Sequence, residues 1–351
     1  MSRRGFLTAS ARAGLGVTGL AALLEGCSSA VHLSPTGPSR GGVTNLIIDG
    51  ARAWFFAGGI TRQSDGSYYL VYQYKPFAGN DYIRGRRLPS LSAPAGPEEV
   101  CFDGVSIDPS VTTLPTGETL VLVHHGAANW LTVRRPDGSF SALTEVGPAG
   151  ESMISRAGER VFIAYKQAGV ESATWIPVLA REIYSPTTFG PPVDTGARTG
   201  AMTPSGMHAQ KRSSIGGIGA SDVLLAWDQP RTPSGGIRSI WVARSQDGTT
   251  WTSHQEVASN GRDLRNAFVL QIDQDQTRVY YEAGGGQIGL VLTADGGRTW
   301  TEPVIASMPR AVTGASRVSL FVHDGSIYCF SGWQTKGGGN LGIFGVGSAA
   351  P

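Results

Sequence analysis

The sequence predicts an all-β protein, and three features of the chain support this class. Glycines and turn dipeptides recur over its 351 residues, with Asp-Gly at positions 65, 137, 247 and 324. Beyond residue 30, no segment shows the 3.6-residue apolar period of an amphipathic helix. Short runs rich in Val, Ile, Tyr and Phe lie between the turns, as half-buried strands require. The chain is therefore expected to fold as many short strands joined by tight turns.

The order of these elements repeats six times as an apolar strand, a short turn, a second apolar strand and a polar turn. We place the second strands of the units at 66–74, 118–125, 160–166, 222–228, 278–285 and 326–333. The units begin near residues 54, 105, 151, 200, 263 and 313, a spacing of about 46 to 63 residues. One four-stranded propeller blade has this length. The repeat predicts a six-bladed β-propeller over residues 43–351, with five blades as the alternative.

The last unit is short, and the strand expected at 43–51 is suited to complete its sheet. Such a closure would join the two ends of the domain and remove an exposed strand edge.

The first 42 residues are interpreted as a targeting segment and a tether. "SRRGFL" at residues 2–7 and the apolar run at 15–24 match a twin-arginine export signal. "LEGC", ending at Cys27, resembles a bacterial lipobox, in which the cysteine is lipidated. Residues 1–27 are thus expected to be a signal peptide and residues 28–42 a flexible linker. The sequence predicts an exported lipoprotein anchored at the cell surface or in the periplasm; the alternative is ordinary cleavage and a soluble product.

Composition excludes several classes of function. The net charge is only +2, and no Lys/Arg run lies beyond the extreme N-terminus, so we expect no nucleic-acid partner. No Cys/His spacing indicates a zinc site, and nothing implies an organic cofactor. Cys101 and Cys329 either pair in an oxidising compartment or remain two buried thiols. The domain is expected to be a monomer.

Two strings identify the scaffold. "TADGGRTW", ending at Trp300, and "RSQDGTTW", ending at Trp251, resemble the Asp-box of sialidases and other β-propeller proteins. In such a turn the aspartate, here Asp295 or Asp247, accepts backbone N–H bonds while the tryptophan packs between blades. In that family these turns lie away from the catalytic centre. The resemblance therefore implies a sialidase-like propeller and a structural role for these four residues.

Propeller ligands usually meet the residues that open each inner strand, because the blades converge there on the axis. In this chain those residues are Arg52, Asp108, Glu151, His208, Arg265 and Arg317. Sialidases clamp the substrate carboxylate with three arginines, since a planar guanidinium binds a carboxylate through two hydrogen bonds. The resemblance implies that Arg52, Arg265 and Arg317, with His208, bind substrate.

Two carboxylates are the candidate catalytic groups. Asp108 opens "DPSVTT", and this Asp-Pro-Ser string resembles the entry to an inner strand of arabinanase-type glycosidases, in which an axial aspartate acts as a base or an orienting group. The alternative for Asp108 is a turn cap before Pro109. Glu151 opens the next unit and is the natural second carboxylate for acid and base chemistry.

Other features depart from the sialidase pattern. The chain lacks a Phe/Tyr-Arg-Ile-Pro string, and the nearest tyrosine–glutamate combination is Tyr280 with Glu282. Trp130 and Trp333 are candidate sugar-stacking residues. Two hypotheses follow: an exported propeller acting on glycans as an exo-glycosidase of the sialidase type, or a non-catalytic surface module that binds a glycan or a protein.

Overall fold

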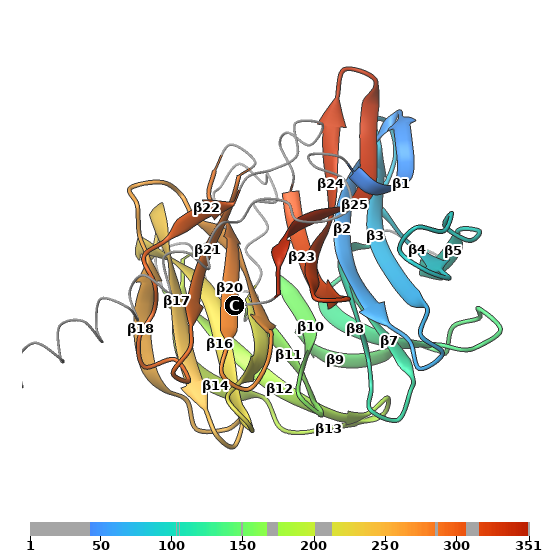
Figure 1. The fold of residues 1–351 in the computed structure, drawn as a ribbon. Helices are drawn as coiled ribbons and strands as arrows, with labels where there is room; N and C mark the ends of the chain where they lie inside the picture. The colour runs from blue at the N-terminus through green and yellow to red at the C-terminus, as the bar shows by residue number, and fades with distance from the viewer. Residues whose placement is uncertain are drawn as a thin grey trace, which may run out of the picture.

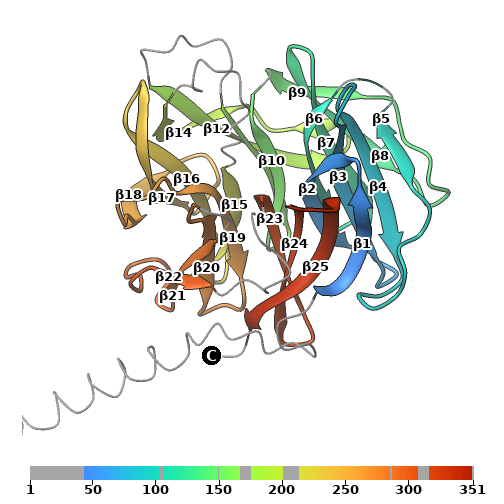
Figure 2. The same ribbon diagram turned by 90° about the horizontal axis from the view of Figure 1, so that it is seen from above.

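The computed structural model describes residues 43–102, 104, 106–148, 150–166, 175–200, 213–284, 287–306 and 316–349. Its regular elements are 25 β-strands in six antiparallel sheets, and the described ranges contain no α-helix. The sheets surround a central axis (Figure 1 and Figure 2). The predicted six-bladed β-propeller is confirmed, and the five-bladed alternative is wrong. The predicted signal peptide, Cys27 and the linker lie outside the described residues.

We number the blades in chain order, giving the innermost strand of each first. Blade 1 comprises β2 (Ala53–Arg62), β3 (Tyr68–Pro76), β4 (Tyr82–Leu88) and β5 (Glu99–Phe102). Blade 2 comprises β6 (Ile107–Thr113), β7 (Thr119–His125), β8 (Ala128–Arg134) and β9 (Thr144–Pro148). Blade 3 comprises β10 (Ser152–Ala157), β11 (Arg160–Lys166) and β12 (Ile176–Ser185), which pairs with both β13 (Thr188–Phe189) and β14 (Val193–Thr199).

The second half of the ring repeats this order. Blade 4 comprises β15 (Ser214–Ile218), β16 (Asp222–Thr232), β17 (Gly235–Ser245) and β18 (Thr252–Ala258). Blade 5 comprises β19 (Arg265–Gln271), β20 (Thr277–Glu282), β21 (Ile288–Thr293) and β22 (Val304–Ala306). Blade 6 comprises β23 (Ser316–His323), β24 (Ser326–Thr335), β25 (Gly338–Ser348) and, at its outer edge, β1 (Val43–Ala51).

The first strand of the domain closes the last blade, as predicted. β1 pairs antiparallel with β25, from Val43 opposite Phe344 to Ala51 opposite Gly339, and Figure 2 shows the two strands side by side. The pairing covers the edge of β25 that would otherwise expose unpaired N–H and C=O groups. It also ties the two ends of the domain together without a disulfide.

The apolar core lies between the blades. In β2, Ala53 and Phe55 are buried while Trp54 between them is exposed, the alternation expected of a strand with two different faces. The buried face of β2 packs on Phe330 and Ile343 of blade 6. Similar clusters fill the other blade interfaces. Each blade is therefore stabilised chiefly by its neighbours, and burial of one such aromatic side chain contributes roughly 1.5–3 kcal/mol.

All six inner strands begin at the same end of the axis, which we call the entrance face; the β24–β25 hairpin marks this end at the top of Figure 1. Serine hydroxyls join successive inner strands. Ile154 N–H donates to Ser110 Oγ at 2.9 Å, and Val269 N–H donates to Ser214 Oγ at 2.7 Å. These bonds fix neighbouring inner strands in register and so set where the entrance residues meet.

The two tryptophan-containing turns lie at the end opposite the entrance face. Asp247 accepts the N–H groups of Thr249 and Thr250, both at 2.7 Å, and these bonds hold the pKa of its carboxyl well below the usual range. For Asp295, burial acts to raise the pKa, but hydrogen bonds led by those from Thr299 outweigh it and lower the pKa to about 2.

The tryptophan of each turn packs at a blade interface. Trp251 is buried in the apolar cluster between blades 3 and 4, and Trp300 packs against the cluster between blades 4 and 5. The contacts of both turns therefore support the scaffold, at a distance from the entrance residues.

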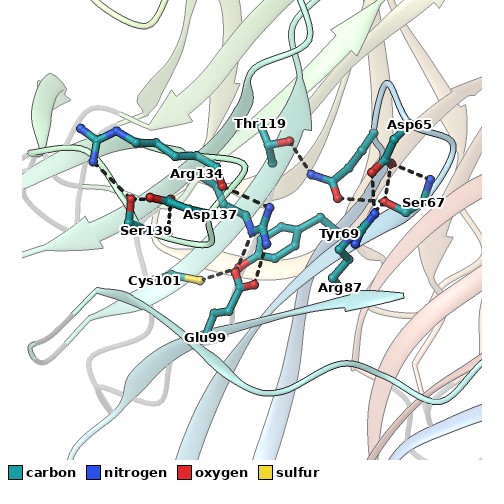
Figure 3. A network of polar contacts seen from close by, with 12 residues as sticks. Asp65, Ser67, Tyr69, Arg87, Glu99, Cys101, Thr119, Arg134, Asp137 and Ser139 are labelled. Atoms are coloured by element: carbon teal, nitrogen blue, oxygen red, sulfur yellow. Dashed lines mark hydrogen bonds and ion pairs between the residues drawn. The ribbon is translucent and has the colours of Figure 1, made fainter. Parts of the chain in front are cut away.

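A polar clamp joins blades 1 and 2 (Figure 3). Arg134 of β8 donates two hydrogen bonds to Glu99 of β5, both at 2.6 Å, and its guanidinium carbon lies 4.5 Å from the ring centre of Tyr69. The Tyr69 hydroxyl contacts the Cys101 thiol at 3.5 Å. Cys101 and Cys329 are both free and buried, so the interpretation as two buried thiols is correct and the two residues do not pair. Burial raises the pKa of the Cys101 thiol to about 12.

Candidate functional site

Asp108 lies at the entrance face in an unusual backbone conformation. It is 2% exposed, and its φ of 54° is in the left-handed region that few non-glycine residues adopt. The ladder between β6 and β7 shifts register between Ile107 and Ser110, so Asp108 sits in a bulge inside a strand and not in a turn before Pro109. Bulges re-aim side chains, and such conformations cluster at functional sites.

Blade 1 supports this bulge. Asp108 N–H donates to Gln73 Oε1 at 3.4 Å, and Gln73 is itself buried on β3. A Cβ atom on Gly58 of β2 would lie 2.7 Å from Pro109 Cγ. Only glycine at position 58 lets the two inner strands approach this closely.

Asn266 is a residue that sequence reasoning missed. It is the second residue of its inner strand, as Asp108 is, and has φ 53°, 7% exposure and a register shift between Arg265 and Phe268. Blade 5 lies opposite blade 2 in a ring of six, so a carboxylate and an amide occupy equivalent places across the axis. The only signal in the sequence was a shared position, since each is the second residue of its inner strand, Asp108 in β6 and Asn266 in β19.

Glu151 forms a buried ion pair with Lys166. Glu151 directly precedes β10 and Lys166 ends β11, so both lie at the entrance face. Lys166 Nζ is 2.7 Å from Glu151 Oε2, and their side chains are 8% and 5% exposed. The sequence predicted the acid but not its partner. Such a pair holds the Glu151 carboxylate at a fixed position next to the axis. Removing both charges from water costs free energy, and the attraction between the two groups at close range must offset this cost.

A row of alternating charges crosses the entrances of blades 4 and 5. Arg238 Nε lies 3.1 Å from Asp228 Oδ1, and both side chains are almost fully buried. Arg238 Nη1 is 3.8 Å from Asp263 Oδ1, and Asp263 accepts a hydrogen bond from Arg265 Nε at 2.7 Å. The guanidinium of Arg265 is therefore engaged within its own blade. Arg238 was not predicted, since nothing in the sequence shows that β17 returns to the entrance face.

The predicted arginine clamp is not assembled by the described side chains. Arg52 is exposed just before β2, and Arg265 pairs with Asp263. Arg317 belongs to β23, but its side chain, like all of His208, lies outside the described residues. The clamp stays a prediction.

The aromatic residues considered for a role at the site are mostly buried. Tyr280 and Tyr281 are fully buried, and burial raises the pKa of both, that of Tyr281 to about 12, which opposes a phenolate nucleophile. Trp333 is 4% exposed and packs edge-on against Phe344, so its predicted sugar-stacking role is wrong. Trp130 is partly buried, and its Nε1–H donates to the His125 carbonyl at 3.1 Å.

Below the entrance residues, a cavity of about 400 Å³ follows the axis. All six inner strands contribute to its wall, with polar groups such as Thr61, Ser110, Ser155 and Gln271. Within the described ranges, no three His, Cys, Asp or Glu side chains gather as metal ligands would. The same ranges contain no helix long and apolar enough to cross a bilayer.

Comparison with known proteins relates the chain by fold alone. No family model matches the sequence, and none of the curated proteins does. An α-L-arabinofuranosidase from Fusarium graminearum matches with a TM-score of 0.58 and 11% identity over 83% of this chain and 92% of that one. A Penicillium chrysogenum α-L-arabinanase complexed with arabinobiose gives 0.57 and 12% over 87% and 97%. The Hadza microbial sialidase Hz136 gives 0.57 and 13% over 84% and 66%.

Proposed function

We propose that this protein is a glycoside hydrolase with its active site at the entrance face. The observation that carries the proposal is Asp108, a buried aspartate held in a left-handed bulge of an inner strand, with Glu151 opening the inner strand of the next blade. Hydrolysis of a glycosidic bond needs two carboxyl groups, one to donate a proton to the leaving oxygen and one to act as nucleophile or to activate water. The structural neighbours, which include an arabinofuranosidase, an arabinanase and a sialidase, support a glycan as substrate.

The surrounding groups have complementary roles. Lys166 fixes one oxygen of Glu151, which suits Glu151 to stabilise positive charge on the sugar ring or to accept a proton from water. Asn266 holds the equivalent position on blade 5, across the axis from Asp108, where sugar hydroxyls must be oriented. The sialidase version adds a carboxylate clamp by Arg317 and Arg52. The arabinofuranosidase version needs no clamp.

The test is hydrolysis of fluorogenic α-L-arabinofuranoside and α-sialoside by the purified protein and its variants. Asp108→Asn is expected to lower kcat by roughly 10²–10⁴-fold with folding intact. Glu151→Gln should lower kcat similarly but also destabilise the fold, because it leaves the buried Lys166 without its counter-charge. The matched control is Glu159→Gln, an acid of blade 3 whose side chain is 78% exposed, and it should leave kcat unchanged. Sialoside cleavage lost in Arg317→Ala would select the sialidase version. Full activity of Asp108→Asn would refute the assignment.

A second candidate function is a non-catalytic glycan-binding module. The engagement of Glu151 by Lys166 favours it, because a carboxylate tied in a buried ion pair is less available for chemistry. Glycan binding without hydrolysis across the substrate panel, by well-folded protein, would select this candidate.

We also propose that the protein is exported and anchored through Cys27, as its first 27 residues predict. β1 is the outermost strand of blade 6 and runs toward the entrance face from Val43, which pairs with Phe344 near the middle of β25, so the chain joins the domain at its outer edge, away from the axis. An anchor there would leave the entrance face open to glycans. Cys27→Ser should move the protein from the membrane to the soluble fraction; unchanged fractionation would refute lipidation.

A further inference from the structure

Two exposed aromatic side chains form a pair at the rim of the entrance face. Trp54 is 45% exposed and Phe77 is 57% exposed, and their ring centres lie 6.0 Å apart at an interplanar angle of 63°. Single exposed apolar residues are common. Two exposed aromatic rings in contact beside a candidate site present an apolar surface on which a sugar ring can stack. We call these two residues the rim platform.

Backbone geometry fixes the platform in place. Trp54 is the second residue of β2, and because Ala53 and Phe55 bury their side chains against blade 6, the indole must lie on the opposite face of the sheet. Phe77 directly follows β3, and its N–H donates to the Arg52 carbonyl at 3.4 Å. Both rings are thus positioned by paired strands and not by a loose loop.

The face of β2 that carries Trp54 also looks toward Asp108. Phe56 lies two residues further along on the same face and is paired with Gln73, whose side-chain oxygen accepts the Asp108 N–H. Further along, Gly58 abuts Pro109. Gly58 lies four positions after Trp54 along β2, which places the platform roughly 13 Å along the strand from that contact. A short oligosaccharide spans this distance, whereas a single sugar does not.

We propose that the rim platform is a distal subsite that stacks on one sugar ring of a glycan chain whose reacting end lies at Asp108. The inference rests on the proposed function and names its substrate class: a chain of several sugars, not an isolated terminal residue. Aromatic rings present a broad apolar surface at low conformational-entropy cost. Lys75, paired across the ladder with Trp54, and its ion-pair partner Asp81 at 3.5 Å supply polar groups near the rings for sugar hydroxyls.

The experiment compares arabino-oligosaccharides of one to six units with a fluorogenic monosaccharide arabinofuranoside. Trp54→Ala and Phe77→Ala should leave kcat/KM for the monosaccharide unchanged and weaken binding of the longer chains about tenfold. The matched control is Tyr184→Ala, because Tyr184 is 59% exposed near the opposite end of blade 3. That variant should behave as the wild type on every chain length.

The outcomes separate the two proposals. Trp54-dependent binding of long chains without any hydrolysis would refute the hydrolase and keep the platform. If kcat/KM for hydrolysis does not rise with chain length, or if Trp54→Ala does not lower it for long chains, the platform is refuted while the hydrolase proposal stands. Absence of binding for every oligosaccharide would overturn the platform for this class of glycan. Self-association that Trp54→Ala abolishes, with sugar binding unchanged, would assign the surface to a protein contact and likewise overturn the proposal.

Discussion

Replacing Lys166 by methionine tests the buried ion pair at the entrance face. Methionine keeps most of the apolar volume of the lysine but removes the cation 2.7 Å from Glu151, whose side chain is only 5% exposed. Leaving one charge of a buried pair uncompensated costs about 3–5 kcal/mol, whereas replacing both charges by neutral groups of similar shape is often close to neutral. We expect Lys166→Met to lower the free energy of unfolding by about 3 kcal/mol, and the double variant Glu151→Gln/Lys166→Met to recover most of that loss.

The assay is urea denaturation followed by tryptophan fluorescence, with all four members of the double-mutant cycle measured at one pH. An exposed pair in the same blade provides the control. Arg156 and Glu159 lie 2.6 Å apart with side chains 38% and 78% exposed, so Arg156→Met should cost no more than about 1 kcal/mol. If Lys166→Met and Arg156→Met lower the free energy of unfolding by equal amounts, burial does not decide how much an ion pair contributes to stability, and the reasoning is refuted.

Three further predictions concern the scaffold. Arg134→Ala removes both hydrogen bonds to Glu99 and should destabilise the protein by about 3 kcal/mol in urea, with Arg134→Lys losing less. Gly332→Ala would place a Cβ atom against the backbone oxygen of Phe55 across the blade 6–blade 1 interface, so thermal unfolding should show a loss of about 2 kcal/mol or more. Asp295 has its pKa lowered to about 2 from 3.8, so its turn contributes stability above pH ~4 that is lost as the pH falls toward 2; because the group is only partly buried and solvent screens it, we expect about 1 kcal/mol or less.

Each of these has an outcome that contradicts it. If the free energy of unfolding of Arg134→Ala lies within about 0.5 kcal/mol of the wild-type value, the contact between Arg134 and Glu99 in Figure 3 contributes little to stability. An unchanged melting temperature for Gly332→Ala would mean that blades 6 and 1 separate easily at that contact. If Asp295→Asn leaves the urea midpoint falling between about pH 4 and pH 2 as steeply as in the wild type, other carboxyl groups account for the acid sensitivity.

Local sequence signals sufficed for the strands and for the closure of the ring. The run at 118–125 became β7 (Thr119–His125), and the strand expected at 43–51 became β1 with the same bounds. Apolar alternation and turn glycines are local properties, so they can be read without knowing the fold. The start of blade 4 was harder to place, because the unit was expected to begin near residue 200 whereas β15 begins at Ser214.

The candidate site depended on contacts between strands that the sequence does not show. Glu151 was predicted from its position in the repeat, but its partner Lys166 lies at the end of the next strand. The left-handed conformation shared by Asp108 and Asn266 follows from register shifts in two ladders, and a register is a relation between strands. Sequence reasoning therefore found one residue of that pair and missed the other.

The sequence by itself determined the strand order, the six-fold repeat and the pairing of the first strand with the last blade, because these follow from periodicity and turn chemistry along the chain. Only the tertiary structure decided which aromatic residues face water. Trp333 and Trp54 are equally apolar, yet Trp333 packs in blade 6 and is 4% exposed, whereas Trp54 is 45% exposed at the rim. Exposure depends on which neighbouring blade covers each face of a strand, and that is fixed when the ring of blades closes.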